Sequence, residues 1–589
     1  MAHQVKKNLG AVLRRGGVEF RVWAPFAKHV AVVGNFADHA IDMTAEGDGY
    51  WHLNQPDVKP GQSYQYKIIT QDDRELYRND PRARALTGSE NGSSVIVAND
   101  FDWGDDIFLP IPRQEQIIYE LHVGTFARPD AATTATLYDA IEKLDHLESL
   151  GVNMIELMPI TSMVSSHGWG YAPNHIYSVE NSYGGRHGLM SFVRACHDHG
   201  IGVVLDVVYN HFDGNGGLWQ FDGWSENNRG GIYFYNDWRG DTPWGGRPDY
   251  GRPEVRQFIL DNIVMWFNEY RVDGLRIDST IYMRNTAARD GDPTHDLPDA
   301  WKLLGDITTT AHKVRPGSML ISEDFAVSEY ITKPTSELGC GFDAQWGLGF
   351  PYVLRDALGL TYGKPADLST LIYELNHRFN DDVWQKVIFT DSHDTAANGS
   401  VRLNEAADPN GGDNLSAQQR LLTASAITMT APGIPMLLQG QEFMQEGAFN
   451  DWQALEWNKI NEYSGIVLAH QHLISLRRNI YGVTAGLVGQ SLAIFHQNDQ
   501  DKVLGYHRWD QGGPGDDTLV LANFGASHFD NYDVHLPVPG TWYIRFNSTW
   551  AGYSDEFDDF TVESFSTDAD GNATIVLPSH AVLIMSQDV

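Results

Sequence analysis

Four short segments in the middle of the chain each end an apolar run with polar side chains that could do chemistry. DVVYNH ends at His211, GLRID ends at Asp278, LISED contains Glu323, and SHD ends at Asp394. The catalytic groups of parallel β-barrels lie at the carboxyl ends of the strands, where loops from different strands meet. The four segments therefore predict one site that is built from four strand ends.

The carboxylates in these segments suit the cleavage of a glycosidic bond. Retaining cleavage uses one carboxylate as nucleophile and a second carboxylic acid as proton donor, about 5–5.5 Å apart. Arg276 lies two residues before Asp278, so both side chains point to the same face of the strand and the guanidinium should keep Asp278 ionised. Glu323 closes an apolar run, so partial burial should raise its pKa toward that of a general acid.

The two histidines and Asp394 could bind sugar hydroxyls next to the cleaved bond. His393 precedes Asp394 directly, and His211 has a similar position after an earlier strand. A single carboxylate at a strand end is more often a solvated loop residue or a helix cap. The coincidence of four such clusters in one chain favours the functional interpretation.

Eight apolar segments alternate with helical patterns and could form the scaffold. In TLYDAIEKLDHLESLG, for example, Leu137, Ile141, Leu144 and Leu147 share one helical face, and Gly151 stops the helix. Strands that alternate with helices in this number predict a (β/α)8 TIM barrel, an α/β fold. The predicted strands lie in IIYELHVGTF, VNMIELMPI, GVVLDVVYNH, VDGLRID, SMLISED, GFDAQW, QKVIFT and IPMLLQGQE.

The two ends of the chain show a different pattern. Short alternating runs such as VEFRVWA and SYQYKIIT, broken by turn residues, predict an N-terminal β-sandwich, and LAIFHQ, KVLGYHR and DTLVLANF predict a C-terminal one. We therefore expect three domains: an N-terminal β-sandwich over 1–110, the catalytic barrel over 111–478 and a C-terminal β-sandwich over 479–589.

The stretch from Phe212 to Arg252 interrupts the alternation of strands and helices and is rich in Gly, Trp, Tyr and Asn. Long loops within compact domains are usually functional, so we expect this one to lie over the active face. Its aromatic residues could bind a sugar chain or could only pack the loop, and the sequence leaves both open. They are Trp219, Trp224, Tyr233, Tyr235 and Trp244.

Composition excludes several classes of partner. Acidic residues outnumber basic ones by 77 to 42, a formal net charge of −35 that repels both nucleic acid and anionic membranes. The aromatic content of 12%, with 17 Trp, suits flat platforms for a neutral ligand such as a sugar, besides ordinary core packing. The first residues lack the apolar stretch of a signal peptide, and the two cysteines do not indicate a disulfide framework, so we expect a cytoplasmic protein.

The motifs DVVYNH, GLRIDST, LISED and SHD resemble, in the same order, the four signature regions of the α-amylase family, glycoside hydrolase family 13. The resemblance implies that Asp278 is the nucleophile, Glu323 the acid/base and Asp394 the stabiliser of the transition state. It also implies sugar-binding roles for His211, Arg276 and His393, and an α-1,4-glucan such as amylose, glycogen or maltooligosaccharides as substrate. The N-terminal segment VEFRVWAPFAKHVAVVGNF resembles the carbohydrate-binding-like domain of several family members.

Further segments bear on the reaction type. HGWGYAPNHIYSVENSYGG resembles branching enzymes and maltooligosyltrehalose trehalohydrolases, in which the Tyr of WGY, here Tyr171, stacks on the sugar. PMLLQGQEF with ALEW resembles the branching-enzyme segment near the eighth strand, and YDVHLPVPGTWYIRFNSTWAGYSDEF resembles the branching-enzyme C-terminal sandwich. Thr395 departs from this pattern, since branching enzymes usually have an acidic residue there. We therefore expect the branching reaction of glycogen biosynthesis, with a hydrolase, either an α-amylase or a trehalohydrolase, as the alternative.

A metal ion is not expected. Asn210 matches a calcium ligand of the calcium-dependent amylases, but branching enzymes generally lack the metal, and the six to eight oxygens that calcium prefers are not apparent in the sequence. No cofactor is expected either.

Overall fold

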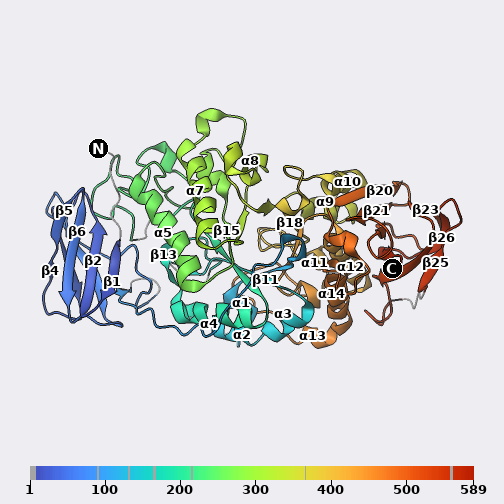
Figure 1. The fold of residues 1–589 in the computed structure, drawn as a ribbon, viewed down its shortest axis with the longest axis horizontal. Helices are drawn as coiled ribbons and strands as arrows, with labels where there is room; N and C mark the ends of the chain where they lie inside the picture. Colours follow the sequence, from blue (N-terminus) through green and yellow to red (C-terminus); the bar gives the residue numbers. More distant parts are fainter. Residues whose placement is uncertain are drawn as a thin grey trace.

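Eight parallel strands close into a barrel at the centre of the computed structural model (Figure 1). The structure describes residues 8–88, 92–129, 133–163, 168–213, 217–361, 363–364, 366–557 and 562–588. All eight predicted strand segments are confirmed. In order around the barrel the strands are β10 (Ile118–Leu121), β11 (Met154–Leu157), β14 (Gly202–Val207), β15 (Gly274–Ile277), β16 (Met319–Ser322), β17 (Ala344–Trp346), β18 (Lys386–Phe389) and β19 (Ile434–Leu438).

The alternation of side chains along each strand separates two apolar cores. Every residue of β14 is buried, because one face points into the barrel and the other is covered by helices. Val204 belongs to an apolar cluster inside the barrel, whereas Leu205 packs in the outer core. The helices that form the outer layer include α4 (Gly185–Asp198), α5 (Pro253–Tyr270), α7 (Pro298–Val314), α12 (Leu415–Thr430) and α14 (Ser464–Arg477).

The interior changes from apolar to polar toward the carboxyl ends of the strands. Asp206 lies two residues beyond Val204 on the same face of β14, and Glu156 lies two residues beyond Met154 on the same face of β11. On β10 the corresponding residue is Glu120, and on β15 it is Arg276. All four of these polar side chains are buried, so the barrel carries a charged layer on top of its apolar filling.

The first predicted barrel helix is split in two. Thr136 caps α2 (Leu137–Ile141) in a capping box with Asp139, and α3 (Leu144–Leu150) ends at Gly151, which has a positive φ of 94°. The break between them lets the apolar positions of both pieces face the barrel, since Leu137 and Leu144 are buried whereas Ile141 is only partly so.

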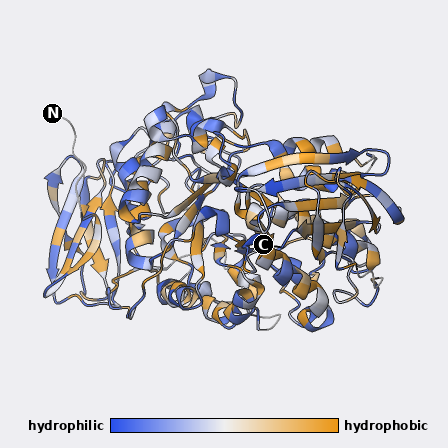
Figure 2. Cartoon of the chain, turned by 45° about the vertical axis from the view of Figure 1, so that its right-hand side comes forward, coloured by the Kyte–Doolittle hydropathy of each residue, from blue (hydrophilic) through white to orange (hydrophobic). Residues whose placement is uncertain are grey.

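Antiparallel sheets form both ends of the molecule, as predicted, at the left and right of Figure 1. Along the N-terminal strands hydrophobic and hydrophilic residues alternate (Figure 2), and Phe20 and Tyr66 are among the buried members. The N-terminal strands are β1 (Gly10–Arg14), β2 (Gly17–Trp23), β3 (His29–Gly34), β4 (Ile41–Asp42), β5 (Thr44–Gly47), β6 (Tyr50–Pro56), β7 (Ser63–Ile69), β8 (Glu75–Arg78) and β9 (Ser94–Val95).

The C-terminal strands form one six-stranded sheet and one two-stranded sheet. The six-stranded sheet contains β20 (Ser491–Asn498), β21 (Val503–Trp509), β22 (Thr518–Asn523), β27 (Ala581–Ser586), β24 (Thr541–Asn547) and β25 (Ser564–Ser566). The smaller one pairs β23 (Phe529–His535) with β26 (Asn572–Leu577). The proposed domain boundaries at residues 110 and 478 lie in connecting segments between these sheets and the barrel.

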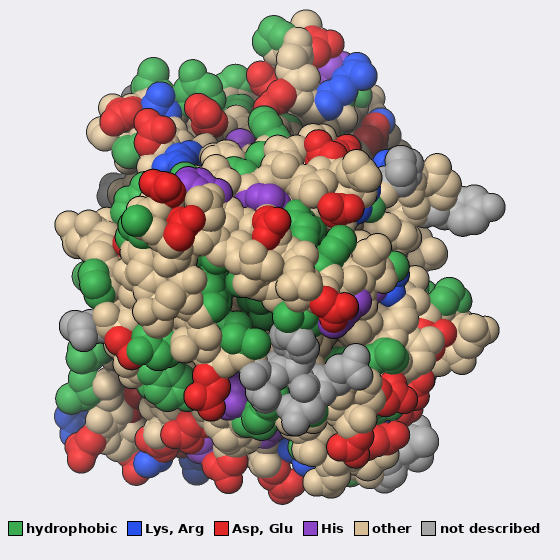
Figure 3. Space-filling model, turned by 90° about the vertical axis from the view of Figure 1, so that its right-hand side faces the viewer, with side chains coloured by type: hydrophobic (Ala, Val, Ile, Leu, Met, Phe, Trp, Pro, Cys, Tyr) green, Lys and Arg blue, Asp and Glu red, His purple; other side chains and the backbone are tan. Residues whose placement is uncertain are grey.

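The charge of the surface agrees with the acidic composition of the chain. On the face shown in Figure 3, Asp and Glu side chains are more frequent than Lys and Arg. No helix among the described residues has both the length and the apolarity that a membrane span requires. Residues 1–7, part of the segment examined for a signal peptide, lie outside the described residues. Cys196 and Cys340 are both buried free thiols.

Candidate active site

The carboxyl ends of the barrel strands bring the predicted site residues together in one open pocket of about 260 Å³. Six of the seven predicted residues line the pocket, and the seventh, Arg276, lies buried beneath it. The pocket is lined by Trp169, Tyr171, His211, Trp244, Asp278, Ser279, Glu323, Phe325, His393, Asp394 and Asn398.

The guanidinium of Arg276 is the shared partner of three carboxylates. Its Nη1 donates to both carboxylate oxygens of Asp206, at 2.8 and 2.7 Å, and to Oδ1 of Asp278 at 2.9 Å. Its Nη2 forms an ion pair with Oε2 of Glu323 at 2.9 Å. Burial by itself would lower the pKa of Arg276, but the Asp206 and Glu323 carboxylates hold it well above its usual value. The charge is also stabilised by the ring of Trp346, 4.4 Å from the guanidinium.

Asp278 is held from two sides at the end of β15. Its Oδ1 accepts from Arg276, and its Oδ2 accepts from the Asn210 side-chain amide at 2.6 Å. The same amide donates to the main-chain carbonyl of Asp278 at 3.0 Å. Both carboxylate oxygens therefore have fixed donors, and the carboxylate faces the pocket in one orientation.

Glu323 is suited to carry a proton at neutral pH. Its side chain is 2% exposed, and its Oε2 accepts from the main-chain N–H of Ser279 at 3.0 Å. Burial raises the pKa of Glu323 to about 8, and the nearby Asp278 and Asp394 carboxylates act in the same direction against the opposing effect of Arg276. Asp278 and Glu323 contact the two terminal nitrogens of one guanidinium, so the two carboxylates are close neighbours, as retaining cleavage requires.

A second set of contacts ties the segments after β15 and β16 together, and the sequence did not predict it. Thr280 donates its main-chain N–H and its Oγ1 to the Glu323 carbonyl, at 2.8 and 3.0 Å. Arg284 donates from Nε and Nη2 to the two carboxylate oxygens of Asp324, both at 2.8 Å. Asp324 and Arg284 are fully buried, so this pair fixes the position of the residue next to Glu323. The available signal was Asp324 itself, a second carboxylate at a buried strand end, which requires a cation.

His393 and Asp394 follow β18 and also line the pocket. Nδ1 of His393 lies 2.6 Å from Oε1 of Glu120, and the main-chain N–H of His393 donates to Oε2 of the same carboxylate at 3.0 Å. Burial alone would lower the pKa of His393, but Glu120 and Asp394 raise it to about 9, so the imidazole is a cation at neutral pH. Asp394 is the more accessible residue, with 42% of its side chain exposed.

The WGY segment completes this wall of the pocket. Tyr171 stacks on His393 with ring centroids 5.2 Å apart, and its hydroxyl donates to Oδ2 of Asp206 at 2.6 Å. Nε2 of His211 is 2.7 Å from the Tyr171 carbonyl. Trp169, which the sequence interpretation did not select, also lines the pocket and packs on Phe449. His167, the first residue of the HGWGY segment, lies outside the described residues.

The aromatic residues of the long loop mostly pack the loop. Tyr233 and Tyr235 are buried, Trp219 packs on Phe234, and Trp224 stacks on Phe26 of the N-terminal sheets. Of the five, Trp244 lines the pocket; it is 51% exposed and its ring lies 5.5 Å from that of His211. The loop interrupts the strand–helix alternation as predicted. Its described residues, 212–213 and 217–252, include the 3-10 helix η3 (Trp238–Gly240).

Thr395 offers no side-chain group to the pocket. Its Oγ1 accepts from the main-chain N–H of Ser392 at 2.8 Å, and the residue is buried. The threonine that departs from the branching-enzyme pattern thus closes the turn that carries His393 and Asp394. Asn398, one turn further on, lines the pocket instead, with its amide 3.4 Å from Oδ1 of Asp394.

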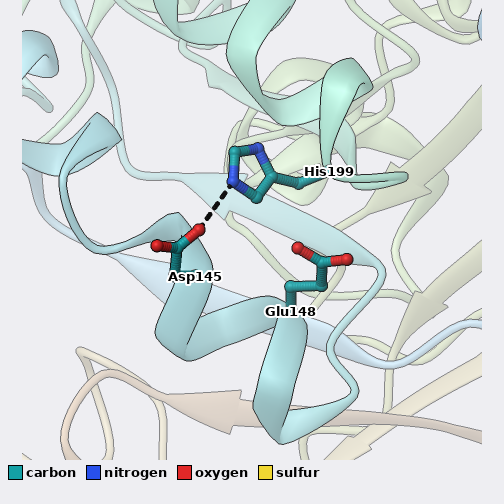
Figure 4. Close-up of side chains that lie close together, drawn as sticks. All are labelled: Asp145, Glu148 and His199. Atoms are coloured by element: carbon teal, nitrogen blue, oxygen red, sulfur yellow. Dashed lines mark hydrogen bonds and ion pairs between the residues drawn. The ribbon is translucent and has the colours of Figure 1, made fainter.

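The side chain of Asn210, which matches a calcium ligand of some amylases, is engaged by its neighbours in the site. The amide of Asn210 donates to Asp278, and its oxygen pairs with His211. Within the described ranges one group of side chains could hold a metal ion: Asp145, Glu148 and His199, on the outside of the barrel (Figure 4). Nδ1 of His199 pairs with the Ala195 carbonyl at 2.8 Å, which raises the pKa of the imidazole, and Nε2 pairs with Asp145 at 3.1 Å. An ordinary surface ion pair accounts for this group, and we assign no ion to it.

Three family models together match nearly the whole chain. The model of the α-amylase catalytic domain matches residues 121–239 and 218–466, and that of the C-terminal all-beta domain of α-amylases matches residues 494–588. The model of carbohydrate-binding module 48, the isoamylase N-terminal domain, matches residues 8–83. These matches follow the barrel and the two sets of flanking sheets.

Individual relatives differ in reaction. A 1,4-alpha-glucan branching enzyme of Corynebacterium jeikeium is 28% identical over 98% of this chain and 82% of its own length. A malto-oligosyltrehalose trehalohydrolase of Saccharolobus solfataricus is 30% identical over 75% of this chain and 76% of its own length. A pullulanase of Anoxybacillus sp., solved with maltotetraose, shares the fold at a TM-score of 0.77 and 20% identity, covering 99% of this chain and 88% of that one.

The turn before Tyr171 provides a test of how the wall of the pocket is held. Gly170 has a φ of +92°, and a Cβ there would meet the Pro159 carbonyl oxygen at 2.3 Å. Gly16 has a similar φ of +94° with nothing within 4 Å. We expect Gly16→Ala to lower the free energy of unfolding by about 1–2 kcal/mol, from backbone strain alone. Gly170→Ala should cost roughly 2–5 kcal/mol, because the overlap adds to the strain.

Calorimetric melting and activity of the two variants check this difference. Gly170→Ala should also lower activity, since the overlap displaces Tyr171, whereas Gly16→Ala should leave activity unchanged. Equal melting temperatures for the two variants would contradict the proposed close contact with Pro159.

Proposed function

Because the chain belongs to the α-amylase family, we propose that it acts on α-glucans as a 1,4-α-glucan branching enzyme, which cleaves an α-1,4 bond and transfers the fragment to a 6-hydroxyl group. The observation that carries the chemistry is the pairing of Asp278 and Glu323 on the guanidinium of Arg276. The observation that favours branching is coverage: the branching-enzyme relative matches 98% of the chain, and the trehalohydrolase matches 75%.

The first step forms a covalent glycosyl–enzyme. An oxygen of Asp278 attacks the anomeric carbon, the bond from that carbon to the bridging oxygen breaks, and Glu323 gives its proton to the leaving oxygen. Glu323 can do this at neutral pH because its pKa is about 8. The leaving part of the glucan carries away the proton as a new 4-hydroxyl group.

The second step returns both carboxylates to their starting states. The 6-hydroxyl of an acceptor chain attacks the anomeric carbon, the bond to Asp278 breaks, and Glu323 takes the hydroxyl proton. Water in place of the acceptor would give hydrolysis through the same intermediate. The outcome therefore depends on how well the pocket holds an acceptor and excludes water.

The remaining pocket residues bind the sugar at the cleavage point. Asp394, the more accessible carboxylate, can accept from two neighbouring hydroxyls and stabilise the positive charge of the transition state. His393, held as a cation by Glu120, donates to a hydroxyl, while Tyr171 and His211 shape the wall against the ring. Amylose, glycogen and maltooligosaccharides are the substrates that we propose.

Hydrolysis is the second candidate, and one structural observation favours it. Thr395 turns away from the pocket, so this position cannot contact an acceptor in the way an acidic residue could. The relative with the higher identity, 30%, is a trehalohydrolase.

Substitution of either carboxylate should abolish activity without unfolding the protein. We expect Asp278→Asn and Glu323→Gln to lower turnover on amylose by at least about ten-thousandfold, because each removes a group that forms or breaks bonds. A glucosyl fluoride substrate separates the roles, since fluoride leaves without protonation. Glu323→Gln should still release fluoride from it, and Asp278→Asn should not. Turnover on amylose above about a tenth of wild type, with melting unchanged, would contradict the assignment.

The pH dependence of cleavage should report the raised pKa of Glu323. The first step needs Glu323 protonated, and its pKa of about 8 means that the acid form persists through neutral pH and is lost as pH rises through about 8. We therefore expect kcat/KM on a maltooligosaccharide to be level near neutrality and to fall tenfold per pH unit well above that value. A fall centred near an ordinary glutamate pKa, about 4.3, would rule out this assignment.

Product analysis decides between transfer and hydrolysis. Incubation with amylose should shift the iodine complex and create α-1,6 branch points that isoamylase can release, while reducing ends stay few. Transfer conserves reducing ends, whereas hydrolysis makes one for each bond cut. A rise in reducing ends in step with the loss of iodine colour, without branch points, would establish the hydrolase.

A further inference from the structure

We propose that the N-terminal sheets position the pocket residue Trp244 by holding the long loop, through a contact set that we call the latch: Phe26, Arg78, Asp222 and Trp224. The inference rests on the proposed function only in placing substrate in this pocket, and it is independent of whether transfer or hydrolysis follows. It gives the N-terminal domain a role at the reaction site, in addition to any binding of glucan on its own surface.

The latch joins the two parts through an aromatic stack. The rings of Phe26 and Trp224 are 4.3 Å apart at their centroids and inclined by 12°. Next to the stack, the main-chain N–H of Phe26 donates to Oδ2 of Asp222 at 2.9 Å, and Asp222 is buried. The guanidinium of Arg252 lies 5.5 Å from the Trp224 ring. An aromatic pair with a buried hydrogen bond beside it fixes both distance and orientation.

A second contact of the latch holds the loop backbone. Arg78, at the end of β8, donates from Nε to the Phe221 carbonyl at 3.1 Å and from Nη2 to the Gln220 carbonyl at 3.3 Å. The loop also approaches the sheet too closely for a side chain at Gly223, where a Cβ would meet Thr70 at 2.2 Å. Residues 220–224 of the loop are thus held by elements outside the barrel.

Asn236 connects the segment after Trp224 with the rest of the loop through hydrogen bonds of its side chain. Its side-chain oxygen accepts from the main-chain N–H groups of Gly231 at 3.0 Å and Glu226 at 3.3 Å. Its amide donates to the carbonyls of Gly231 at 2.8 Å and Phe234 at 2.9 Å. The side chain is buried, so one asparagine ties the Trp224 end of the loop to residues 231–236.

A short series of contacts leads from Asn236 to the pocket. The main-chain N–H of Tyr235 donates to the Arg247 carbonyl at 3.2 Å. Arg247 is fully buried, and its Nε donates to the Tyr282 carbonyl at 2.8 Å. Trp244, three residues earlier, lines the pocket and packs on the Tyr282 ring in an edge-to-face contact with centroids 4.7 Å apart. Pro243 beside it is exposed, and the turn is closed by main-chain hydrogen bonds from Arg247 to Gly240 at 2.9 Å and between Gly246 and Phe212 at 3.0 Å, so the position of Trp244 depends on the base of its turn.

A half-exposed tryptophan in a polar pocket is a platform for a sugar ring only if it is held in place before the sugar arrives. A loose loop would have to be ordered on binding, and that cost would appear as weaker affinity. Removing the latch should therefore weaken substrate binding and leave the bond-breaking step nearly unchanged, because the carboxylates are fixed by barrel contacts.

The test is the effect of Trp224→Ala on short maltooligosaccharides, which are too small to reach the N-terminal sheets as well as the pocket. We expect KM to rise about 5- to 20-fold with kcat within about twofold of wild type. Trp224→Phe, which keeps a stacking ring, should restore most of the affinity. The matched control is Arg14→Ala, which removes an exposed ion pair with Glu19 on the N-terminal sheets and should leave KM unchanged.

A double substitution shows whether the latch acts through Trp244. Residues that act through one group are not additive, so Trp224→Ala should have almost no further effect on KM in a Trp244→Ala background. A lower melting temperature with unchanged KM, or an equal rise in KM in both backgrounds, would overturn the proposal.

A binding measurement separates this inference from the proposed function. The dissociation constant of a maltooligosaccharide, measured by calorimetry on the Glu323→Gln variant, should rise by the same factor when Trp224 is replaced. If the wild-type protein binds maltooligosaccharides but never cleaves them, the proposed function fails and this test of the latch still stands. An unchanged dissociation constant rejects the latch whatever the reaction proves to be.

Discussion

The pocket depends on one buried cation. Arg276 contacts Asp206, Asp278 and Glu323 at the same time, and Asp394 stands close above them. Burial raises the pKa of the Glu323 carboxyl group to about 8 against the effect of Arg276, so Glu323 keeps its proton at neutral pH. Asp278 instead takes two hydrogen bonds, from Asn210 and Arg276, and the side chain of Asp394 is 42% exposed. The three carboxyl groups of the pocket thus differ in their surroundings and not only in their residue types.

The barrel strands fix the position of the buried Arg276 guanidinium. Trp346 lies against the guanidinium from β17, and the strands β14 and β15 place Asp206 directly opposite Arg276 in register. The Thr280 and Asp324 contacts then join the segments beyond the strands, so that the spacing of the two carboxylates does not depend on flexible loops. Rigid strand ends and a fixed charge balance are what a two-step mechanism on one pair of carboxylates needs.

The two flanking parts are attached to the barrel in different ways. The C-terminal sheets pack on the outer helix α12, where Arg508 donates to the Thr430 carbonyl and Thr423 to the His580 carbonyl. The N-terminal sheets contact the long loop that carries Trp244 and also helix α5, where the hydroxyl of Tyr50 donates to Glu254 at 3.3 Å. The loop therefore has support from outside the barrel in addition to its own contacts, such as the two main-chain hydrogen bonds between Phe212 and Gly246. In Figure 1 the two sets of sheets lie on opposite sides of the barrel.

Local sequence patterns determined the eight strands, both sets of flanking sheets and the site residues Arg276, Asp278 and Glu323, but not their buried partners Asp206 and Glu120. Burial on two faces, alternation and carboxylates at strand ends can each be recognised within a few residues of sequence. Asp278, Glu323 and Asp394 could be named for that reason. The break between α2 and α3, the inward turn of Thr395, the choice of Trp244 among five loop aromatics, and the pairing of Asp324 with Arg284 were decided by the tertiary structure. Each depends on which distant side chain occupies the adjoining space, and no local pattern records that.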